Sequence, residues 1–181
     1  MRKIILLLVL IGPAGFAGAQ ETKTELTSPA SDYDSRPNSA SVPDVYAVGG
    51  QFERVVVIRL KYKTDLLAGL EKAVKDNNIQ NAVLLAGTGS VMSCHYHVVS
   101  NTGFPTRNIF VKDRADPADL VSLNGYVIKG RVHAHATFTS ADKAFGGHLE
   151  PGTTVFTFAI ITVGVLSDEL DLSRVDDKNY R

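Results

Sequence analysis

The sequence contains one cysteine and no tryptophan in 181 residues, and it has no excess of charge of either sign. Because Cys94 is the only cysteine, no intramolecular disulfide can form. We expect this side chain to be a small buried core residue rather than a metal ligand or an intermolecular bridge. Nineteen basic residues balance 19 acidic ones. General nucleic-acid-binding proteins normally carry a basic excess, so the composition argues against that class without excluding a local basic patch.

The first 19 residues have the pattern of a secretory signal peptide. Arg2 and Lys3 form a short basic region, residues 4–11 are apolar, and Ala-Gly-Ala at 17–19 predicts cleavage after residue 19. The apolar run is too short to cross a bilayer as a helix, so we expect no stable membrane insertion after cleavage. An uncleaved anchor is the alternative. Cleavage predicts an exported, periplasmic or secreted protein and leaves 17 of the 19 basic residues against 19 acidic ones.

Residues 20–47 are rich in Ser, Thr, Pro and Asp and show no apolar periodicity. Such a segment buries too little surface to offset the entropy cost of ordering it, so we expect a flexible leader or an arm. Residues 48–181 are long enough for one domain with a substantial core.

The domain combines several strand patterns with one helix pattern. Apolar residues at helical spacing predict the main helix at 64–77, with Thr64 able to cap it. Gly-Thr-Gly at 87–89 predicts a tight turn; a phosphate-binding turn is the weaker alternative, because the longer glycine fingerprint is incomplete. Strands are expected at 52–62, 81–86, 91–99, 108–112 and 153–166, with a weak signal at 170–172. These elements predict an α+β domain with a largely antiparallel β-sheet packed against one helix.

A β-hairpin is expected between residues 119 and 138. A short strand at 119–123 is followed by Asn124–Gly125, which is a strong signal for a two-residue turn, and then by an apolar run at 126–138. Lys129–Gly130–Arg131 would therefore lie inside the second strand.

Three of the five histidines lie close together in the chain. His133 and His135 alternate on the strand expected at 126–138, so they share a face and lie about 6.5 Å apart. His148 follows Gly146–Gly147, which can let the backbone pass close to a neighbouring strand, subunit or ligand. Three imidazoles with one open position are typical of a reactive zinc site, although imidazole also suits copper, nickel and iron. We expect a divalent metal site here, zinc first; sheet histidines satisfied by hydrogen bonds are the alternative.

His95 and His97 form a second His-x-His on the strand expected at 91–99. An exposed, solvated pair is the favoured interpretation, and a secondary metal site is the alternative. If this strand lies beside the strand of His133, four or five imidazoles would cluster. No catalytic residue is assigned. Polar residues near enough along the chain to support the ligands are Thr137, Asp142 and Glu150.

Four motifs occur in an order that resembles a known family. They are Ala-Gly-Thr-Gly-Ser-Val at 86–91, Leu-Val-Ser-Leu-Asn-Gly at 120–125, His-Ala-His at 133–135 and Gly-Gly-His-Leu at 146–149. Over about residues 55–165 the chain is similar to the PPC domain (plants and prokaryotes conserved, also called DUF296). The resemblance implies a compact α+β fold and assembly as a homotrimer. For some prokaryotic members it also implies zinc at the positions that are His133, His135 and His148 here.

In plants this domain is joined to AT-hook motifs, which insert Arg-Gly-Arg into the DNA minor groove. No Arg-Gly-Arg occurs in this sequence, so plant-type DNA binding does not follow from the resemblance. The favoured function is an exported protein that binds a metal or a small molecule. A metal-dependent hydrolase and a DNA-binding protein are the alternatives. A cupin barrel is a minor alternative for the fold, because residues 136–140 lack the carboxylate that a cupin would place after His135.

Overall fold

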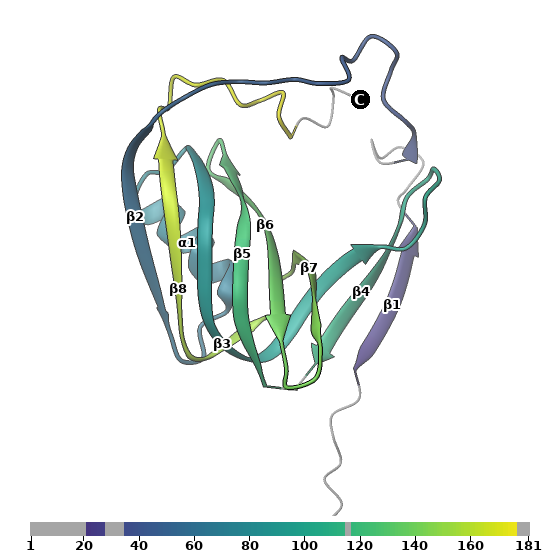
Figure 1. The fold of residues 1–181 in the computed structure, drawn as a ribbon, viewed down its shortest axis with the longest axis vertical. Coiled ribbons are helices and arrows are strands. Elements are labelled where there is room, and N and C mark those ends of the chain that lie inside the picture. The colour runs from purple at the N-terminus through teal and green to yellow at the C-terminus, as the bar shows by residue number, and fades with distance from the viewer. Residues whose placement is uncertain (1–20, 28–34, 115–116, 177–181) are drawn as a thin grey trace, which may run out of the picture.

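The computed structural model describes residues 21–27, 35–114 and 117–176. The signal peptide predicted at 1–19 lies outside these residues. Within the described ranges, no helix is long and apolar enough to cross a membrane. This part of the chain forms one eight-stranded sheet with one α-helix packed on it (Figure 1). The predicted α+β fold with a largely antiparallel sheet is therefore confirmed.

The order of the strands brings distant parts of the chain together. In chain order the elements are β1 (Thr22–Thr27), β2 (Phe52–Lys61), α1 (Leu66–Asp76), β3 (Asn81–Val99), β4 (Arg107–Arg114), β5 (Ala118–Ile128), β6 (Arg131–Thr139), β7 (Ala144–Leu149) and β8 (Thr154–Leu166). The sheet order is β1-β4-β3-β5-β6-β7, and β8 pairs with both β2 and β3. Because β7 also pairs with β3, the strands β3, β5, β6 and β7 close on themselves.

The helix α1 packs on the face of the sheet that forms the core. Asp65 caps α1, because its carboxylate accepts a hydrogen bond from the amide of Ala68 at 2.9 Å, so the cap is one residue later than the predicted Thr64. The apolar side of α1 is buried in the core through Leu66, Leu70 and Val74. On β6 the residues that join this core are Ala134, Ala136 and Phe138. His133 and His135 alternate with them and therefore lie on the opposite face.

The prediction of two strands joined by a tight turn at 87–89 was wrong. Residues 81–99 form one strand, whose register against β8 shifts at three places. A Cβ atom on Gly87 would lie 2.4 Å from the Cβ of Leu123, and one on Gly89 would lie 2.3 Å from the carbonyl oxygen of Phe158. These glycines are therefore required by close strand packing, not by a turn.

The hairpin at 119–138 is present, but its turn lies elsewhere. β5 continues through Asn124–Gly125, and the turn is formed by Lys129 and Gly130 with φ of 52° and 73°. Two positive φ values are what a type I′ turn requires. Gly125 instead allows close approach, since a Cβ there would lie 2.0 Å from the carbonyl oxygen of His133. The prediction that Lys129 and Gly130 lie inside a strand was wrong, whereas Arg131 is the first residue of β6.

Two strands were not predicted, and one weak prediction failed. β1 lies in the segment expected to be a flexible leader and pairs with β4, and β7 carries the Gly-Gly-His motif. Residues 170–172 form no strand. The tail after β8 runs over the same end of the sheet as residues 35–51 (Figure 1). There the guanidinium of Arg174 lies 5.1 Å from the ring centre of Tyr46.

Candidate metal centre

Neighbouring strands bring four histidines together on the face of the sheet opposite α1. β6 pairs with β7 so that His135 is opposite His148, and β7 pairs with β3 so that His148 is opposite His97. His133 lies two residues before His135 on the same face. The potential ligand atoms of His133, His135 and His148 all lie within 4.8 Å of one another. The three histidines singled out from the sequence therefore converge.

The two glycines before His148 let β7 fit between its neighbours. A Cβ atom on Gly147 would lie 2.3 Å from the carbonyl oxygen of His97 on β3. A Cβ atom on Gly146, whose φ is 154°, would lie 2.0 Å from the carbonyl oxygen of Ala136 on β6. The close approach expected of Gly146–Gly147 is thus an approach to neighbouring strands.

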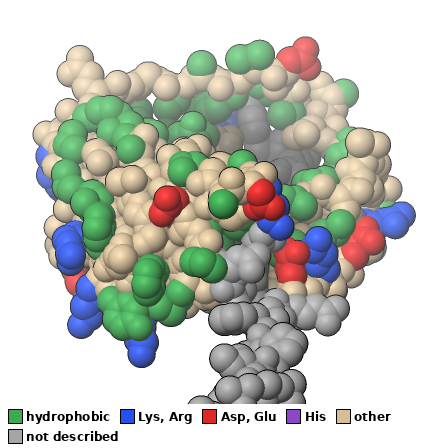
Figure 2. All heavy atoms as spheres, turned by 60° about the horizontal axis from the view of Figure 1, so that its bottom comes forward, with side chains coloured by type: hydrophobic (Ala, Val, Ile, Leu, Met, Phe, Trp, Pro, Cys, Tyr) green, Lys and Arg blue, Asp and Glu red, His purple; other side chains and the backbone are tan. Residues whose placement is uncertain are grey.

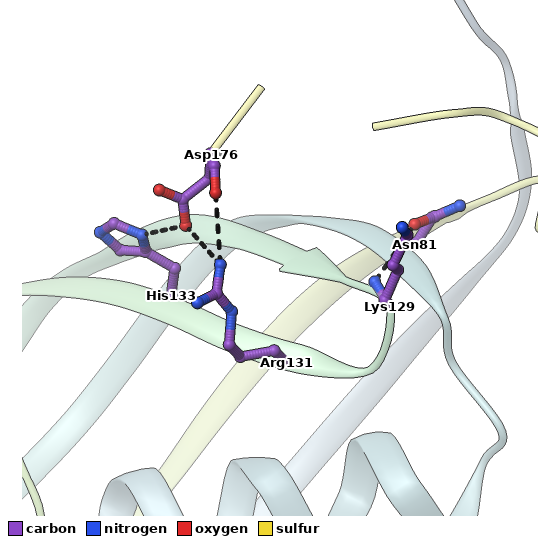
Figure 3. A network of polar contacts seen from close by, with 5 residues as sticks. All are labelled: Asn81, Lys129, Arg131, His133 and Asp176. Atoms are coloured by element: carbon purple, nitrogen blue, oxygen red, sulfur yellow. Dashed lines mark hydrogen bonds and ion pairs between the residues drawn. The ribbon is translucent and has the colours of Figure 1, made fainter. Parts of the chain in front are cut away.

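Asp176 in the C-terminal tail orients His133. The Nδ1 of His133 lies 2.8 Å from a carboxylate oxygen of Asp176, which also accepts a hydrogen bond from the guanidinium of Arg131 at 3.1 Å (Figure 3). A carboxylate only accepts, so His133 donates from Nδ1, and Nε2 is the nitrogen that is left to bind a cation. Asp176 could not be identified from the sequence, because 43 residues separate it from His133 and no local pattern links them.

Two of the imidazoles are held in the neutral form that metals require. Burial, and after it the nearby His97, His133 and His135, together lower the pKa of His148 to about 4, although Asp176 acts in the opposite direction. Burial first, and then His133 and His97, also lower the pKa of His135. Near neutral pH both rings are therefore unprotonated, and their lone pairs are available to a cation.

His97 joins the cluster, whereas His95 is held elsewhere. The ring centres of His97 and His148 are 4.5 Å apart, and Nδ1 of His97 lies 2.6 Å from Oε1 of Glu150. Nδ1 of His95 instead lies 2.6 Å from the carbonyl oxygen of Pro151. Both histidines are half-buried, so the interpretation of an exposed, solvated pair was wrong.

A cavity of about 440 Å³ opens beside His133 and His135. Its size is in the range that holds small organic molecules. The cavity is also lined by Val83, Leu84, Asn124, Gly125, Tyr126, Val175 and Asp176. A metal ion on the histidines would lie at a wall of this mostly apolar cavity.

Comparisons with known proteins agree with the motifs. A curated relative, the bifunctional protein GlmU of Synechococcus sp. strain JA-3-3Ab, is 27% identical over 137 residues, or 75% of this chain. The chain spans 20% of that protein's length.

Solved structures share the fold. A metal-containing protein from Archaeoglobus fulgidus aligns with 23% identity and a TM-score of 0.59, over 70% of this chain and 89% of the other. A plant- and prokaryote-conserved protein from Pyrococcus horikoshii aligns with 23% identity and a TM-score of 0.56, over 70% and 87%. The family model of the Plants and Prokaryotes Conserved domain matches residues 47–167, well over half of the sequence. The chain therefore belongs to the plants and prokaryotes conserved domain family that its motifs resemble.

Proposed function

We propose that this protein is exported and binds one divalent metal ion, zinc first, through His133, His135 and His148. The observation that carries the proposal is the convergence of their ligand atoms within 4.8 Å of one another. His133 and His135 share one face of β6, β7 pairs with β6 so that His148 is opposite His135, and Gly146–Gly147 lets β7 approach its neighbours closely. Three protein ligands leave a coordination position for water or for a polar group of a second ligand.

The residues present fit such an ion. Zinc binds histidine nitrogen at about 2.0–2.1 Å, so ligand atoms around one tetrahedral ion lie about 3.3 Å apart. To reach that spacing, ligand atoms that lie up to 4.8 Å apart would have to approach one another by about 1.5 Å. Asp176 already holds His133 in the tautomer that ligation needs. The A. fulgidus protein of the same fold is described as metal-containing, which supports the proposal by analogy.

The adjoining cavity supports a small-molecule ligand. Val83 and Tyr126 provide apolar surface, while Asn124 provides an amide that can donate or accept hydrogen bonds. A molecule with a metal-binding polar group and an apolar body matches both parts of this site.

Elemental analysis of tag-free protein tests the metal proposal. The parent is expected to carry one tightly held ion per chain after dialysis against metal-free buffer, and His133→Ala and His148→Ala are expected to lose it. His95→Ala is the matched control, because His95 belongs to neither group of converging ligand atoms. A parent without metal, or unchanged metal content in both ligand variants, would defeat the proposal.

We also propose that the protein is a homotrimer. The outward-facing residues of β2 and β8 include Val55, Val57 and Phe158, which are 57%, 66% and 39% exposed. Seen from the lower end of Figure 1, hydrophobic side chains gather with Lys and Arg side chains along one flank of the molecule (Figure 2). A sheet face with this much apolar surface favours association with other copies. Light scattering at micromolar concentration is expected to give three times the chain mass, and a monomer would contradict the proposal.

A metal-dependent hydrolase is the second candidate, because an open coordination position adjoins a cavity. A bound divalent ion lowers the pKa of its water to about 7 and so supplies a nucleophile near neutrality. Turnover of p-nitrophenyl acetate or p-nitrophenyl phosphate by metal-loaded parent, lost in His133→Ala, would favour it. Salt-dependent binding to an AT-rich duplex would instead favour the DNA-binding alternative.

Mass spectrometry of protein from the native cell envelope tests export, for which the mature N-terminus is expected at Gln20.

A further inference from the structure

His148 also lies next to potential ligands that do not belong to the three-histidine site. His97, His148 and Glu150 form a second group whose potential ligand atoms all lie within 4.8 Å of one another. His97 comes from β3, and His148 comes from β7, with Glu150 just after it. We propose that His97 and Glu150 build a second divalent-cation position beside the first, with His148 between the two.

The backbone places these three residues next to one another, so their proximity does not depend on the conformations of long side chains. His97 and His148 are direct partners in the β3–β7 register, and their rings are stacked with centres 4.5 Å apart. The backbone amide of Glu150 donates to the carbonyl oxygen of His95 at 3.0 Å, which anchors the residue beside β3. The ring of Phe110 also packs near His97, with ring centres 4.8 Å apart. The two donor side chains are therefore held in place before any ion arrives.

The chemistry of the group suits a divalent transition metal. Imidazole nitrogen and carboxylate oxygen are both zinc ligands, and manganese and iron also accept this mixture. The side chains of His97 and Glu150 are each 21% exposed, so the carboxylate is largely removed from water. In the structure its charge is met by the Nδ1 of His97 at 2.6 Å. A divalent cation replaces that hydrogen bond and offsets the negative charge more fully, after the two atoms separate to about 3.3 Å.

His148 decides the order in which the positions fill. Because His148 completes a set of three imidazoles with His133 and His135, it is a ligand of the first ion. The second ion is then held by His97, Glu150 and water, and it binds more weakly because it has fewer protein ligands. When the first site is removed, His148 is released to the second. This position does not depend on the first site, since His97 and Glu150 remain when His133 or His135 is changed.

A zinc titration of metal-free protein, followed by equilibrium dialysis and elemental analysis, tests the proposal. The parent and His95→Ala are expected to bind two ions per chain in two steps. His97→Ala and Glu150→Gln are expected to bind one, with the tighter step unchanged. A parent that saturates at one ion, or His97→Ala and Glu150→Gln variants that still bind two, would overturn it. Circular dichroism confirms that each variant is folded before it is scored.

The outcomes separate this position from the three-histidine site. In His133→Ala the tight step is expected to disappear, so that no ion survives dialysis against metal-free buffer, while in the titration one ion still binds more weakly through His97, His148 and Glu150. If instead His133→Ala keeps both steps and His97→Ala loses one, the second position stands and the three-histidine proposal fails. Replacement of zinc by cobalt(II) gives an independent readout. Its visible absorption is expected to show two successive spectra in the parent and one in Glu150→Gln, and a single spectrum in the parent would count against a second position.

Discussion

A carboxylate oxygen of Asp176 accepts a hydrogen bond from Nδ1 of His133 at 2.8 Å and another from the guanidinium of Arg131 at 3.1 Å. The last described residue of the chain thus holds a histidine that lies 43 positions earlier. This contact connects the C-terminal tail to the metal centre, because it fixes both the ring orientation and the tautomer of His133.

Removing the charge of Asp176 is expected to weaken metal binding without abolishing it. In Asp176→Asn the amide still reaches His133 but no longer stabilises a metal-bound imidazole, and loss of such partners typically costs about 10–100-fold in affinity. Competition of zinc between the protein and a chromophoric chelator measures the change. Asp168→Asn is the control, since that exposed carboxylate lies in the same tail. Equal affinity in both variants would show that Asp176 plays no part.

Adding a methyl group at Gly147 is expected to separate β7 from β3 and disperse the histidines. The new Cβ would lie 2.3 Å from the carbonyl oxygen of His97, so the strand must move. Gly147→Ala should therefore lose bound zinc while keeping the circular dichroism spectrum of a folded protein. Gly103→Ala, which meets nothing within 4 Å, is the control. Full zinc content in Gly147→Ala would contradict the tight β3–β7 approach.

The metal-free protein is expected to lose stability as the pH falls through the range set by His148. Its folded-state pKa is about 4, below the ordinary value of 6.5, mainly because of burial. Between these values the unfolded chain binds more protons than the folded chain, so the free energy of unfolding rises with pH across this range. Urea denaturation in the presence of a chelator, near both ends of the range, measures the slope. His148→Gln should flatten it relative to His95→Ala; an equal slope in both variants would assign the effect to other groups.

The helix is expected to contribute much of the core's stability through Leu70. This side chain is fully buried, and replacing such a leucine by alanine costs about 2–5 kcal/mol in the free energy of unfolding. Leu26 on the edge strand β1 is 53% exposed, so Leu26→Ala should cost less than about 0.5 kcal/mol. Urea denaturation of both variants gives the comparison. Similar losses would mean that α1 is not the main partner of the sheet.

Local patterns were sufficient to predict most elements of the fold. Apolar periodicity predicted α1, β2 and β8 to within two residues at either end, because these elements each bury one face in a common core. Glycines inside strands led to wrong predictions of turns. Asn124–Gly125 reads as a turn, yet Gly125 is there because its neighbour on β6 comes too close for a side chain. The turn itself uses Lys129, whose positive φ has no local sequence signal.

The site was predictable only where its residues are near in sequence. His133, His135 and His148 could be grouped because one strand and one Gly-Gly motif connect them. The place of His97 depends on the β3–β7 register, and that of Asp176 on the path of the tail, so both are set by contacts between distant segments. Three residues were expected to support the ligands. Glu150 lies in the cluster, Asp142 accepts a hydrogen bond from the hydroxyl of Ser140, and Thr137 is exposed on β6.

Anomalous diffraction from crystals of zinc-loaded protein, recorded on both sides of the zinc absorption edge, tests the metal centre most directly. We expect the strongest anomalous peak about 2.0–2.1 Å from one nitrogen of each of His133, His135 and His148. We also expect the hydrogen bond between His133 and Asp176 to persist beside it. A peak bound by other residues alone, or no peak in crystals soaked to saturation, would contradict the account and leave the histidines as hydrogen-bonded members of the sheet.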